Sequence, residues 1–178
     1  MKKRPKKLAI DTFYTQDNAY TVGIIFSNWD SNLPDSVISC NTPNPSPYIP
    51  GEFYKRELPC ILDLLKEVDL QEISTIIIDG YVWIEKDGLL CDGLGAKLYE
   101  VLNDPEITVI GVAKSKFSGC EEYSYPILRG TATKPLYVQS IGRISGKNAS
   151  SLIKNMKGSC KLPDLLKYLD RKTKNLLP

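Results

Sequence analysis

The spacing of hydrophobic positions predicts a sheet at the start of the chain. Residues 7–15 and 19–27 are rich in β-forming side chains and are separated by three turn-compatible residues, so they predict a hairpin. A third strand is predicted at 36–40, which gives three consecutive antiparallel strands. The following segment, "NTPNPSPYIPGEFY" at 41–54, contains four prolines and a glycine and indicates an ordered surface loop.

Further along the chain the period of the pattern changes to that of a helix. Apolar residues recur at helical spacing from Glu57 to Val68, with Pro59 near the first turn. A strand at 74–80, a glycine-rich connection, a helix at 93–102 and a strand at 108–115 predict a β-α-β unit whose apolar strands are parallel and covered on both faces. The remaining predicted elements are strands at 122–130 and 135–142, a helix at 147–156 and a terminal helix from Pro163.

Length and composition fit one ordinary globular domain. With 178 residues, 42% hydrophobic and 25% charged, we expect a single domain over 1–178 with a flexible basic arm at 1–6. No apolar run approaches the roughly 20 residues of a membrane helix. The basic start "MKKRPKK" is not followed by the apolar segment of a signal peptide, because Asp11 interrupts it. We therefore expect a cytoplasmic monomer that does not bind membranes.

The residue types available for catalysis narrow the chemistry. The chain has no histidine, which excludes Ser-His and Cys-His nucleophilic pairs and argues against the usual zinc hydrolase site. Its five cysteines are odd in number, widely spaced and without a C-x-x-C pair, so they fit neither a secreted disulfide framework nor a zinc knuckle. We expect them to be small buried thiols.

Charge is strongly segregated beneath the net charge of +2. Residues 1–7 and 143–178 together carry fourteen Lys and Arg against two acids, a net +12, whereas the centre sums to −10. Such basic ends suit a nucleic acid bound through its phosphates, with the central acids available to hold divalent cations. A basic tag and a solvated basic helix would give the same numbers, and charge alone does not decide between the two interpretations.

Three acids stand in apolar sequence, where a charge needs a partner. Asp11 lies inside the first strand, Glu57 opens the first helix and Asp79 ends the strand at 74–80. Open α/β sheets bind ligands at the carboxyl ends of their strands, and Mg²⁺ prefers oxygen ligands there. For each acid alone, a salt bridge or an N-cap is the plainer interpretation. Lys114, at the end of a neighbouring strand, can reach the same edge of the sheet.

Eight segments, in their order and spacing, resemble the endonuclease V family over almost the whole chain. The combination of "PYIPG", a following "RE" and a later "GVAKS" is far more specific than any one segment alone. The segments are "AIDTFY" (9–14), "PYIPGEFYKRELP" (47–59), "IIIDG" (76–80), "GLGAKL" (93–98), "IGVAKSKFSG" (110–119), "ILRG" (127–130), "KPLYVQSIGRIS" (134–145) and "KLPDLLKYLDR" (161–171).

The resemblance implies a fold and a set of catalytic residues. The fold would be α/β and ribonuclease-H-like, with a mixed five-stranded core sheet of three antiparallel and two parallel strands, flanked by helices. Asp11, Glu57 and Asp79 match the family acids that bind Mg²⁺ or Mn²⁺ directly or through water. Lys114 matches the lysine that lies near the scissile phosphate. These four residues are the implied catalytic set.

The resemblance also implies a substrate. Family members nick a DNA or RNA strand near inosine or deoxyinosine, at the second phosphodiester on its 3′ side, through a metal-activated water. The proline-rich loop resembles the family's strand-separating wedge, and the flipped base would enter a pocket lined by backbone. The implied substrate-binding residues are Tyr48, Ile49, Pro50, Gly51, Gly80 and Gly111.

The histidines of the family pattern are missing. The family usually continues after "DG" with "HG" and a further histidine, and here Glu85 stands at about the place of the latter. Glu85, Asp87 and Asp92 are hard oxygen donors that can substitute as metal ligands, or they are solvated loop acids. The histidine of the "SxGHRxS" motif is also absent near Arg143. The alternative to a nuclease is therefore a non-cleaving nucleic-acid-binding module on the same fold, and a more remote one is a structural interaction protein.

Overall fold

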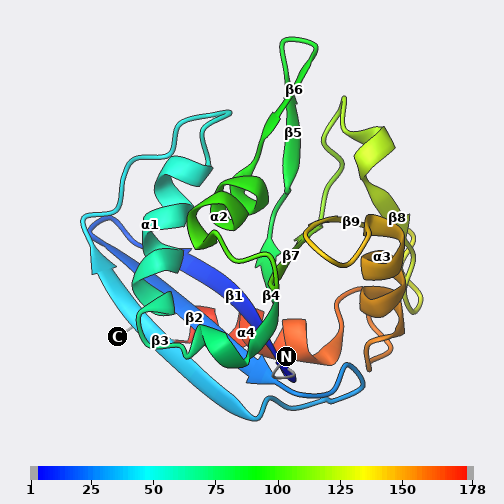
Figure 1. The fold of residues 1–178 in the computed structure, drawn as a ribbon, viewed down its shortest axis with the longest axis horizontal. Helices are drawn as coiled ribbons and strands as arrows, with labels where there is room; N and C mark the ends of the chain where they lie inside the picture. The colour runs from blue at the N-terminus through cyan, green and yellow to red at the C-terminus, as the bar shows by residue number, and fades with distance from the viewer. Residues whose placement is uncertain (1–3, 176–178) are drawn as a thin grey trace.

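A mixed sheet of seven strands runs through the centre of the molecule (Figure 1). The computed structural model describes residues 4–175. The strands are β1 (Lys6–Tyr14), β2 (Asn18–Phe26), β3 (Ser36–Pro43), β4 (Ile73–Asp79), β7 (Thr108–Ala113), β8 (Tyr125–Ile127) and β9 (Leu136–Ile141). They follow the order β3-β2-β1-β4-β7-β9-β8. β1 to β3 pair antiparallel, β4 is parallel to β1 and β7, and β9 and β8 form an antiparallel edge.

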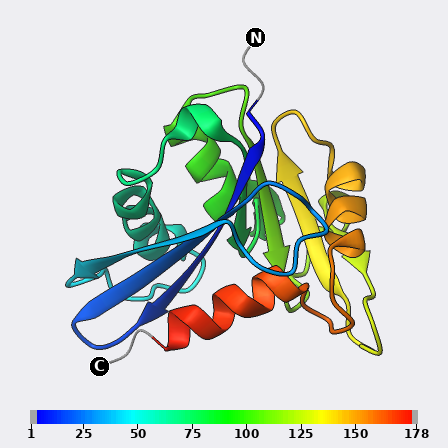
Figure 2. The same ribbon diagram turned by 90° about the horizontal axis from the view of Figure 1, so that it is seen from below.

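Helices cover both faces of the sheet. α1 (Tyr54–Leu65) and α2 (Leu94–Leu102) pack on one face, and α3 (Gly146–Asn155) and α4 (Asp164–Lys174) pack on the other. Figure 2 shows α4 lying across its face of the sheet beside β1 and β2. The two short 3-10 turns are η1 (Leu70–Glu72) and η2 (Glu121–Tyr123).

Local sequence sets where these helices begin and end. The Ser145 hydroxyl accepts the Asn148 N–H at 3.3 Å and caps the start of α3. Pro163 precedes the first residue of α4, where a missing N–H costs nothing. α2 ends at Asn103, whose φ of 46° is the left-handed conformation that commonly closes a helix.

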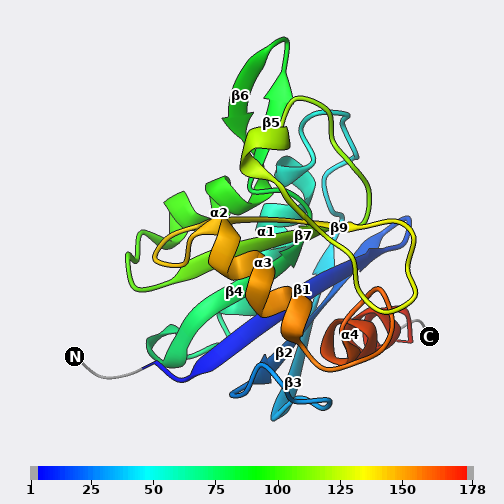
Figure 3. The same cartoon turned by 90° about the vertical axis from the view of Figure 1, so that its right-hand side faces the viewer.

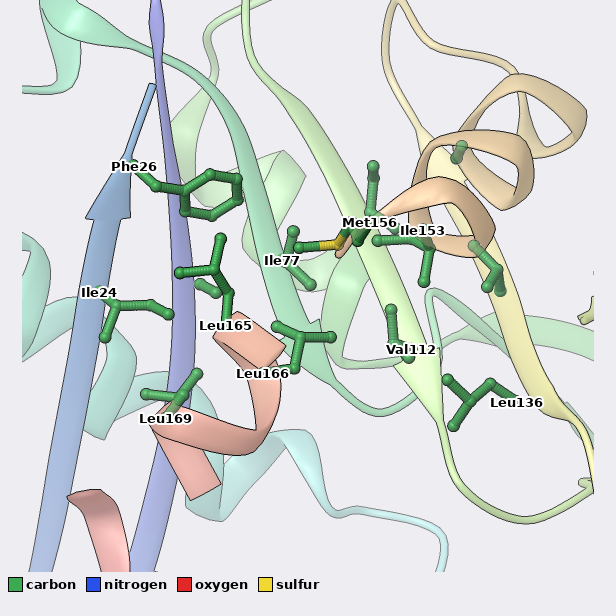
Figure 4. Close-up of a cluster of buried hydrophobic side chains, with 14 of the residues drawn as sticks. Ile24, Phe26, Ile77, Val112, Leu136, Ile153, Met156, Leu165, Leu166 and Leu169 are labelled. Carbon is green, nitrogen blue, oxygen red and sulfur yellow. The ribbon is translucent and has the colours of Figure 1, made fainter. Parts of the chain in front are cut away.

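Two apolar layers hold the helices to the sheet. In the layer under α3 and α4, Leu165, Leu166 and Leu169 pack against strand residues that include Ile24 and Ile77 (Figure 4). The layer under α1 and α2 contains Leu64 and Leu98 against the other faces of β1, β4 and β7. Successive residues of a strand point to opposite faces of the sheet. The position of a residue along its strand therefore decides which of the two layers its side chain faces.

The ribonuclease-H-like fold predicted from sequence is confirmed. Strands β3-β2-β1-β4-β7 form the expected core, with three antiparallel strands and two parallel neighbours. Strands β9 and β8 extend this core at one edge. The strand predicted at 122–130 is limited to β8, because residues 121–123 form η2 instead. The first helix begins three residues earlier than Glu57, at Tyr54.

A hairpin replaces the glycine-rich connection expected after the fourth strand. β5 (Trp83–Lys86) and β6 (Leu89–Asp92) pair antiparallel and project from the body of the molecule (Figure 3). Asp87 and Gly88 connect them with φ values of 53° and 78°. Two consecutive positive φ angles are what a two-residue hairpin turn requires, and Asp-Gly is a favoured pair there.

The predicted basic arm overlaps the start of the sheet. Its residues 1–3 lie outside the described part of the chain. β1 already begins at Lys6, and the Arg4 side chain donates to Asp104 Oδ2 at 2.7 Å. Across residues 4–175, no helix combines the length and apolarity needed to cross a membrane.

Candidate active site

Asp11 and Asp79 lie side by side at one edge of the sheet. Ile10 of β1 pairs in parallel with Ile78 of β4, so the next residue on each strand is the acid. Ala9 and Ile77, two positions earlier, face the layer under α4. The period-two alternation of strands therefore directs both carboxylates to the α4 side of the sheet. The parallel pairing of β1 and β4 therefore brings Asp11, which lies within β1, beside Asp79, which is the last residue of β4.

Lys114 and Asp170 complete this cluster. The Lys114 ammonium, one residue beyond β7, lies 3.1 Å from Asp79 Oδ2 and 3.4 Å from Asp170 Oδ1. Asp170 comes from α4 and also accepts from Lys174 Nζ at 2.7 Å. Asp170 was not singled out from sequence, although it stands in "KLPDLLKYLDR". Its position directly after the buried Leu169, at the margin of the apolar face of α4, is the signal that could have identified it.

Glu57 reaches the same cleft from the opposite helical layer. It lies in the first turn of α1, where a carboxylate is favoured by the helix dipole, and it is only 7% exposed. Burial raises the pKa of Glu57 to about 7, against a hydrogen bond from Tyr14 that lowers it, and the nearby charges of Asp11 and Asp79 raise it further. Asp11 interacts electrostatically with both Asp79 and Asp170, and Glu57 with Asp11 and Asp79, so the four acids form one group of interacting charges.

Asp11 is the most perturbed of the acids on the α4 side. Burial raises its pKa to about 6, and the neighbouring charge of Asp79 adds to this, while Lys114 and a hydrogen bond from Thr173 oppose it. Desolvation lowers the pKa of Lys114, but the charges of Asp79, Asp170 and Asp11 outweigh it and leave the pKa raised. The cluster is thus a concentration of negative charge, with the Lys114 ammonium between Asp79 and Asp170 and the Lys174 ammonium on the other oxygen of Asp170.

A cleft of about 450 Å³ opens above these residues. Asp11, Glu57, Asp79 and Lys114 line its polar end. The remaining wall consists of aromatic and glycine residues, on which flat apolar groups can stack, together with mostly aliphatic side chains such as Ile10, Ile78 and Leu94. The aromatic and glycine residues of the wall are Tyr48, Phe53, Tyr54, Tyr81, Phe117, Gly51, Gly80 and Gly93.

The loop before α1 presents its apolar side chains to solvent at this cleft. Tyr48 is 57% exposed and Ile49 is 42% exposed. The Tyr48 ring meets Phe53 edge-to-face, with ring centroids 6.4 Å apart. Pro50 and Gly51 form the following turn, in which Gly51 has a φ of 77°. An exposed aromatic residue on a proline-stiffened loop is available to contact a ligand.

The two glycines expected in a base pocket have different positions. Gly80 lines the cleft, and its N–H donates to Val112 O at 3.1 Å. Gly111 lies behind it in β7, where an added Cβ would approach Gly80 O to 2.5 Å. Gly111 therefore allows the close packing that supports the cleft wall.

The acids considered as replacements for the missing histidine lie away from the cleft lining. The Glu85 carboxylate accepts the Gly88 N–H within the hairpin, and the side chain packs against Gly119. Asp87 occupies the hairpin turn, and Asp92 lies 3.4 Å from Lys97 Nζ. The structure does not bring these three acids to Asp11 and Asp79.

The chemistry of the cluster fits a hard divalent cation. Its donors are carboxylate oxygens, the ligands that Mg²⁺ and Mn²⁺ prefer. Burial, and after it the charges of neighbouring carboxylates, raises the pKa of both Asp11 and Glu57, and a bound cation would offset this cost of ionisation. Within residues 4–175, however, no three Asp, Glu or Cys side chains stand close enough to form a ready-made metal site. Lys114, between Asp79 and Asp170, provides the positive charge there.

Two curated relatives match the sequence. The chain is 30% identical over 177 residues to the bifunctional methyltransferase/endonuclease of Picrophilus torridus, covering 94% of this chain and 53% of that protein. It is 28% identical over 147 residues to endonuclease V of Nostoc punctiforme, covering 72% of this chain and 63% of that protein. The chain thus spans less than two thirds of the length of either relative. A scan against protein-family models finds no match.

Solved structures share the fold at low sequence identity. Human endonuclease V superposes with a TM-score of 0.72 at 18% identity, over 96% of this chain and 83% of that one. Endonuclease V of Ciona intestinalis, in complex with a 24mer DNA containing an inosine followed by a ribo-adenosine, superposes with a TM-score of 0.73 at 16% identity, over 96% of this chain and 84% of that one. These likenesses establish the fold.

The sheet order defines a ribonuclease-H-like fold. In sequence the chain is similar to the endonuclease V of Nostoc punctiforme, and in fold it is similar to solved endonuclease V structures.

Proposed function

We propose that the protein is a Mg²⁺-dependent endonuclease that nicks DNA or RNA near inosine or deoxyinosine, at the second phosphodiester 3′ to the lesion. The attacking group would be a metal-activated water. The observation that carries this proposal is the meeting of Asp11, Glu57, Asp79 and Lys114, from four separate elements, at the polar end of one cleft. The structure of Ciona intestinalis endonuclease V in complex with DNA that contains an inosine supports the choice of substrate.

The carboxylates supply the catalytic end of the cleft. Asp11, Glu57 and Asp79 would hold Mg²⁺, with Mn²⁺ as the alternative, and the chemistry of such an ion is to activate a water and to neutralise charge on the phosphate. The Lys114 side chain is 46% exposed at its pair with Asp79, so its ammonium can turn to a phosphate oxygen entering the cleft. Once the Lys114 ammonium turns away, the carboxylate oxygens of Asp79 and Asp170 would be available to bind a cation.

The aromatic end supplies the binding surface for the base. The Tyr81 hydroxyl donates to Ser115 O at 2.6 Å and accepts the Phe117 N–H at 2.9 Å, which fixes the ring between the ends of two strands. Phe117 lies beside it, with ring centroids 5.7 Å apart. These rings, together with Tyr48 and Phe53 across the cleft, offer stacking surfaces for a base that has left its helix.

Cleavage of a defined oligonucleotide tests the proposal. Purified protein is incubated with Mg²⁺ or Mn²⁺ and a strand that contains one inosine, or a matched strand with adenosine. We expect a nick at the second phosphodiester on the 3′ side of inosine, lost in Asp11→Asn and Asp79→Asn and retained in the control Asp92→Asn. Asp92 is a suitable control because it lies outside the cleft lining and pairs with Lys97.

The opposite result selects the alternative function. Salt-dependent binding of the inosine strand without any metal-dependent nick would identify a non-cleaving nucleic-acid-binding module. Neither binding nor cleavage would leave a structural interaction role on the same fold.

A further inference from the structure

A buried arginine outside the cleft donates five hydrogen bonds to the end of α3 and to the connector that follows this helix. Arg129, in the "ILRG" segment after β8, is only 5% exposed. Its Nε–H donates to Lys154 O at 3.1 Å, and Nη1 donates to Cys160 O at 2.9 Å and Lys161 O at 3.3 Å. Nη2 donates to Met156 O and, at 3.3 Å, to Gly158 O. All five acceptors belong to the end of α3 or to the connector that leads to α4.

The bonds use what is specific to a guanidinium group. Arginine presents five N–H donors in a rigid planar fork, whereas lysine offers three donors around one point. The last carbonyls of a helix have no partner within it, and Arg129 satisfies that of Lys154 in the last turn of α3 and that of Met156, which caps the helix. A buried charge is costly unless its donors are used, so this arrangement stabilises only one path of the connector.

Two glycines let the connector approach this closely. Gly130 has a φ of 56°, and an added Cβ would lie 1.8 Å from Ser159 O. Gly158 has a φ of 119°, and an added Cβ would lie 2.5 Å from Asp164 Oδ1, at the start of α4. The Arg-Gly pair therefore fixes the path of the backbone from α3 to α4.

The connector leads directly to the acid cluster. Lys161 Nζ donates to the backbone carbonyl of Lys114 at 3.0 Å. Leu162 lines a cavity of about 30 Å³ together with Asp11, Asp79, Lys114 and Asp170. Asp170 itself stands on the helix that the connector begins. The position of two residues around Lys114 thus depends on the path that Arg129 holds.

We infer that Arg129 is a positioning residue, which fixes the α3–α4 connector and thereby sets Lys161 and Asp170 against Lys114 at the acid cluster. Arg129 does not line the cleft and touches neither the acids nor the proposed substrate position. Its structural effect stands without the nuclease activity, whereas its effect on cleavage rests on the proposed function.

Three variants test this inference. Arg129→Lys keeps the charge but cannot reach five carbonyls. Lys161→Met removes only the bond to Lys114 O and leaves the buried arginine intact, so it folds even if Arg129→Lys does not. Gln139→Met is the matched control, because Gln139 is 1% exposed and accepts the N–H groups of Val82 and Trp83 at 2.9 and 2.7 Å on the aromatic side of the cleft.

Hydrogen–deuterium exchange and Mn²⁺ binding are measured alongside single-turnover cleavage. In Arg129→Lys we expect about tenfold faster exchange in residues 156–163 and in the first turn of α4, weaker Mn²⁺ binding, and a cleavage rate constant about tenfold lower with little change in KM. Lys161→Met should show the same direction with a smaller effect. Gln139→Met should instead raise KM and increase exchange in residues 80–83.

The outcomes separate the inference from the proposed function. Unchanged exchange in 156–163 for Arg129→Lys, or the same kinetic split in Gln139→Met as in Arg129→Lys, would overturn it. If Arg129→Lys unfolds, the deciding variant is Lys161→Met. Unchanged cleavage and unchanged Mn²⁺ binding in Lys161→Met would then overturn the inference. If the wild-type protein does not cleave, the proposed function fails, and the exchange and Mn²⁺ measurements still decide the role of Arg129.

Discussion

The Lys114 ammonium lies 3.1 Å from the Asp79 carboxylate and 3.4 Å from that of Asp170, so a protein cation stands inside the acid cluster. The same acids are those expected to hold a divalent ion. A metal ion bound at these acids would compete with Lys114 for Asp79, and the displaced Lys114 ammonium would be free to turn toward the substrate. Lys114 should therefore have two opposing effects: its ammonium lowers the affinity of the acids for the metal ion and speeds the chemical step.

Replacing Lys114 should separate these effects. In Lys114→Met we expect Mn²⁺ to bind several-fold more tightly, since a competing charge is gone, and cleavage to slow by about 100-fold, since a group that stabilises phosphate charge is lost. Calorimetric titration of Mn²⁺ and single-turnover cleavage measure the two quantities. Weaker Mn²⁺ binding in the variant would contradict the competition. Lys116→Met is the control. Lys116 lies two residues after Lys114 in the chain, and its ammonium pairs with Glu121.

The raised pKa values of Asp11 and Glu57 predict how the metal-free protein responds to pH. Both acids bind protons more tightly when folded, so they contribute stability that is fully present below about pH 4 and is lost as pH rises through about 6 and 7. In EDTA, the free energy of unfolding should fall between pH 5 and pH 8 by on the order of 3 kcal/mol. Urea denaturation measures it.

Isosteric amides provide the control for this pH effect. Asp11→Asn and Glu57→Gln should each flatten the profile and stabilise the metal-free protein at pH 8. Asp170 does not confound the window, because Lys174 and Lys114 lower its pKa and its titration lies at more acidic pH. A free energy of unfolding that rises from pH 5 to pH 8 in EDTA would show that the acids are not buried together.

Tyr48 should matter for opening a duplex more than for the chemistry. Its ring is 57% exposed, so Tyr48→Ala should change the unfolding free energy by less than about 0.5 kcal/mol. We expect nicking of duplex inosine DNA to fall at least tenfold, with a smaller change on single-stranded DNA, because loss of one base-stacking contact is worth about 1–3 kcal/mol. Comparing the two substrates under single-turnover conditions checks this. Equal losses on both would place Tyr48 in the chemical step. Leu33→Ala, at another exposed apolar residue, is the control.

The sequence identifies the sheet and the strand-end acids because both follow from local rules. Alternating and continuous apolar runs give β1 to β4 and β7, and parallel strands bring Asp11 and Asp79 to one edge. Asp170 escapes such reasoning, since an acid on an amphipathic helix looks the same whether it faces solvent or a distant strand end. Only the packing of Leu165, Leu166 and Leu169 on the sheet brings it to Lys114.

The hairpin and Arg129 were missed for related reasons. β5 and β6 have four residues each and carry mixed polar and apolar side chains, so no period is visible in so short a run. Only the Asp87-Gly88 pair signals the turn. Arg129 lies in a segment that resembles the family, but its five acceptors belong to a connector far along the chain, and backbone carbonyls leave no trace in sequence.

The basic face of α4 should bind phosphates of the substrate. Arg171 and Lys172 are exposed on the helix that carries Asp170, whereas Lys174 is engaged with that acid. Each phosphate contact that is lost should reduce the slope of log K against log salt concentration by about 1 and weaken all sequences alike. We therefore expect Arg171→Gln with Lys172→Gln to lower the slope by about 1–2, without changing the preference for inosine over adenosine. Lys66→Gln, which removes another exposed cation, paired with Asp63 of α1, should leave the slope unchanged. Binding to the two oligonucleotides at several salt concentrations, with Ca²⁺ in place of Mg²⁺ to limit cleavage, measures the slope, and an unaltered slope in the double variant would mean that this face of α4 stays in solvent.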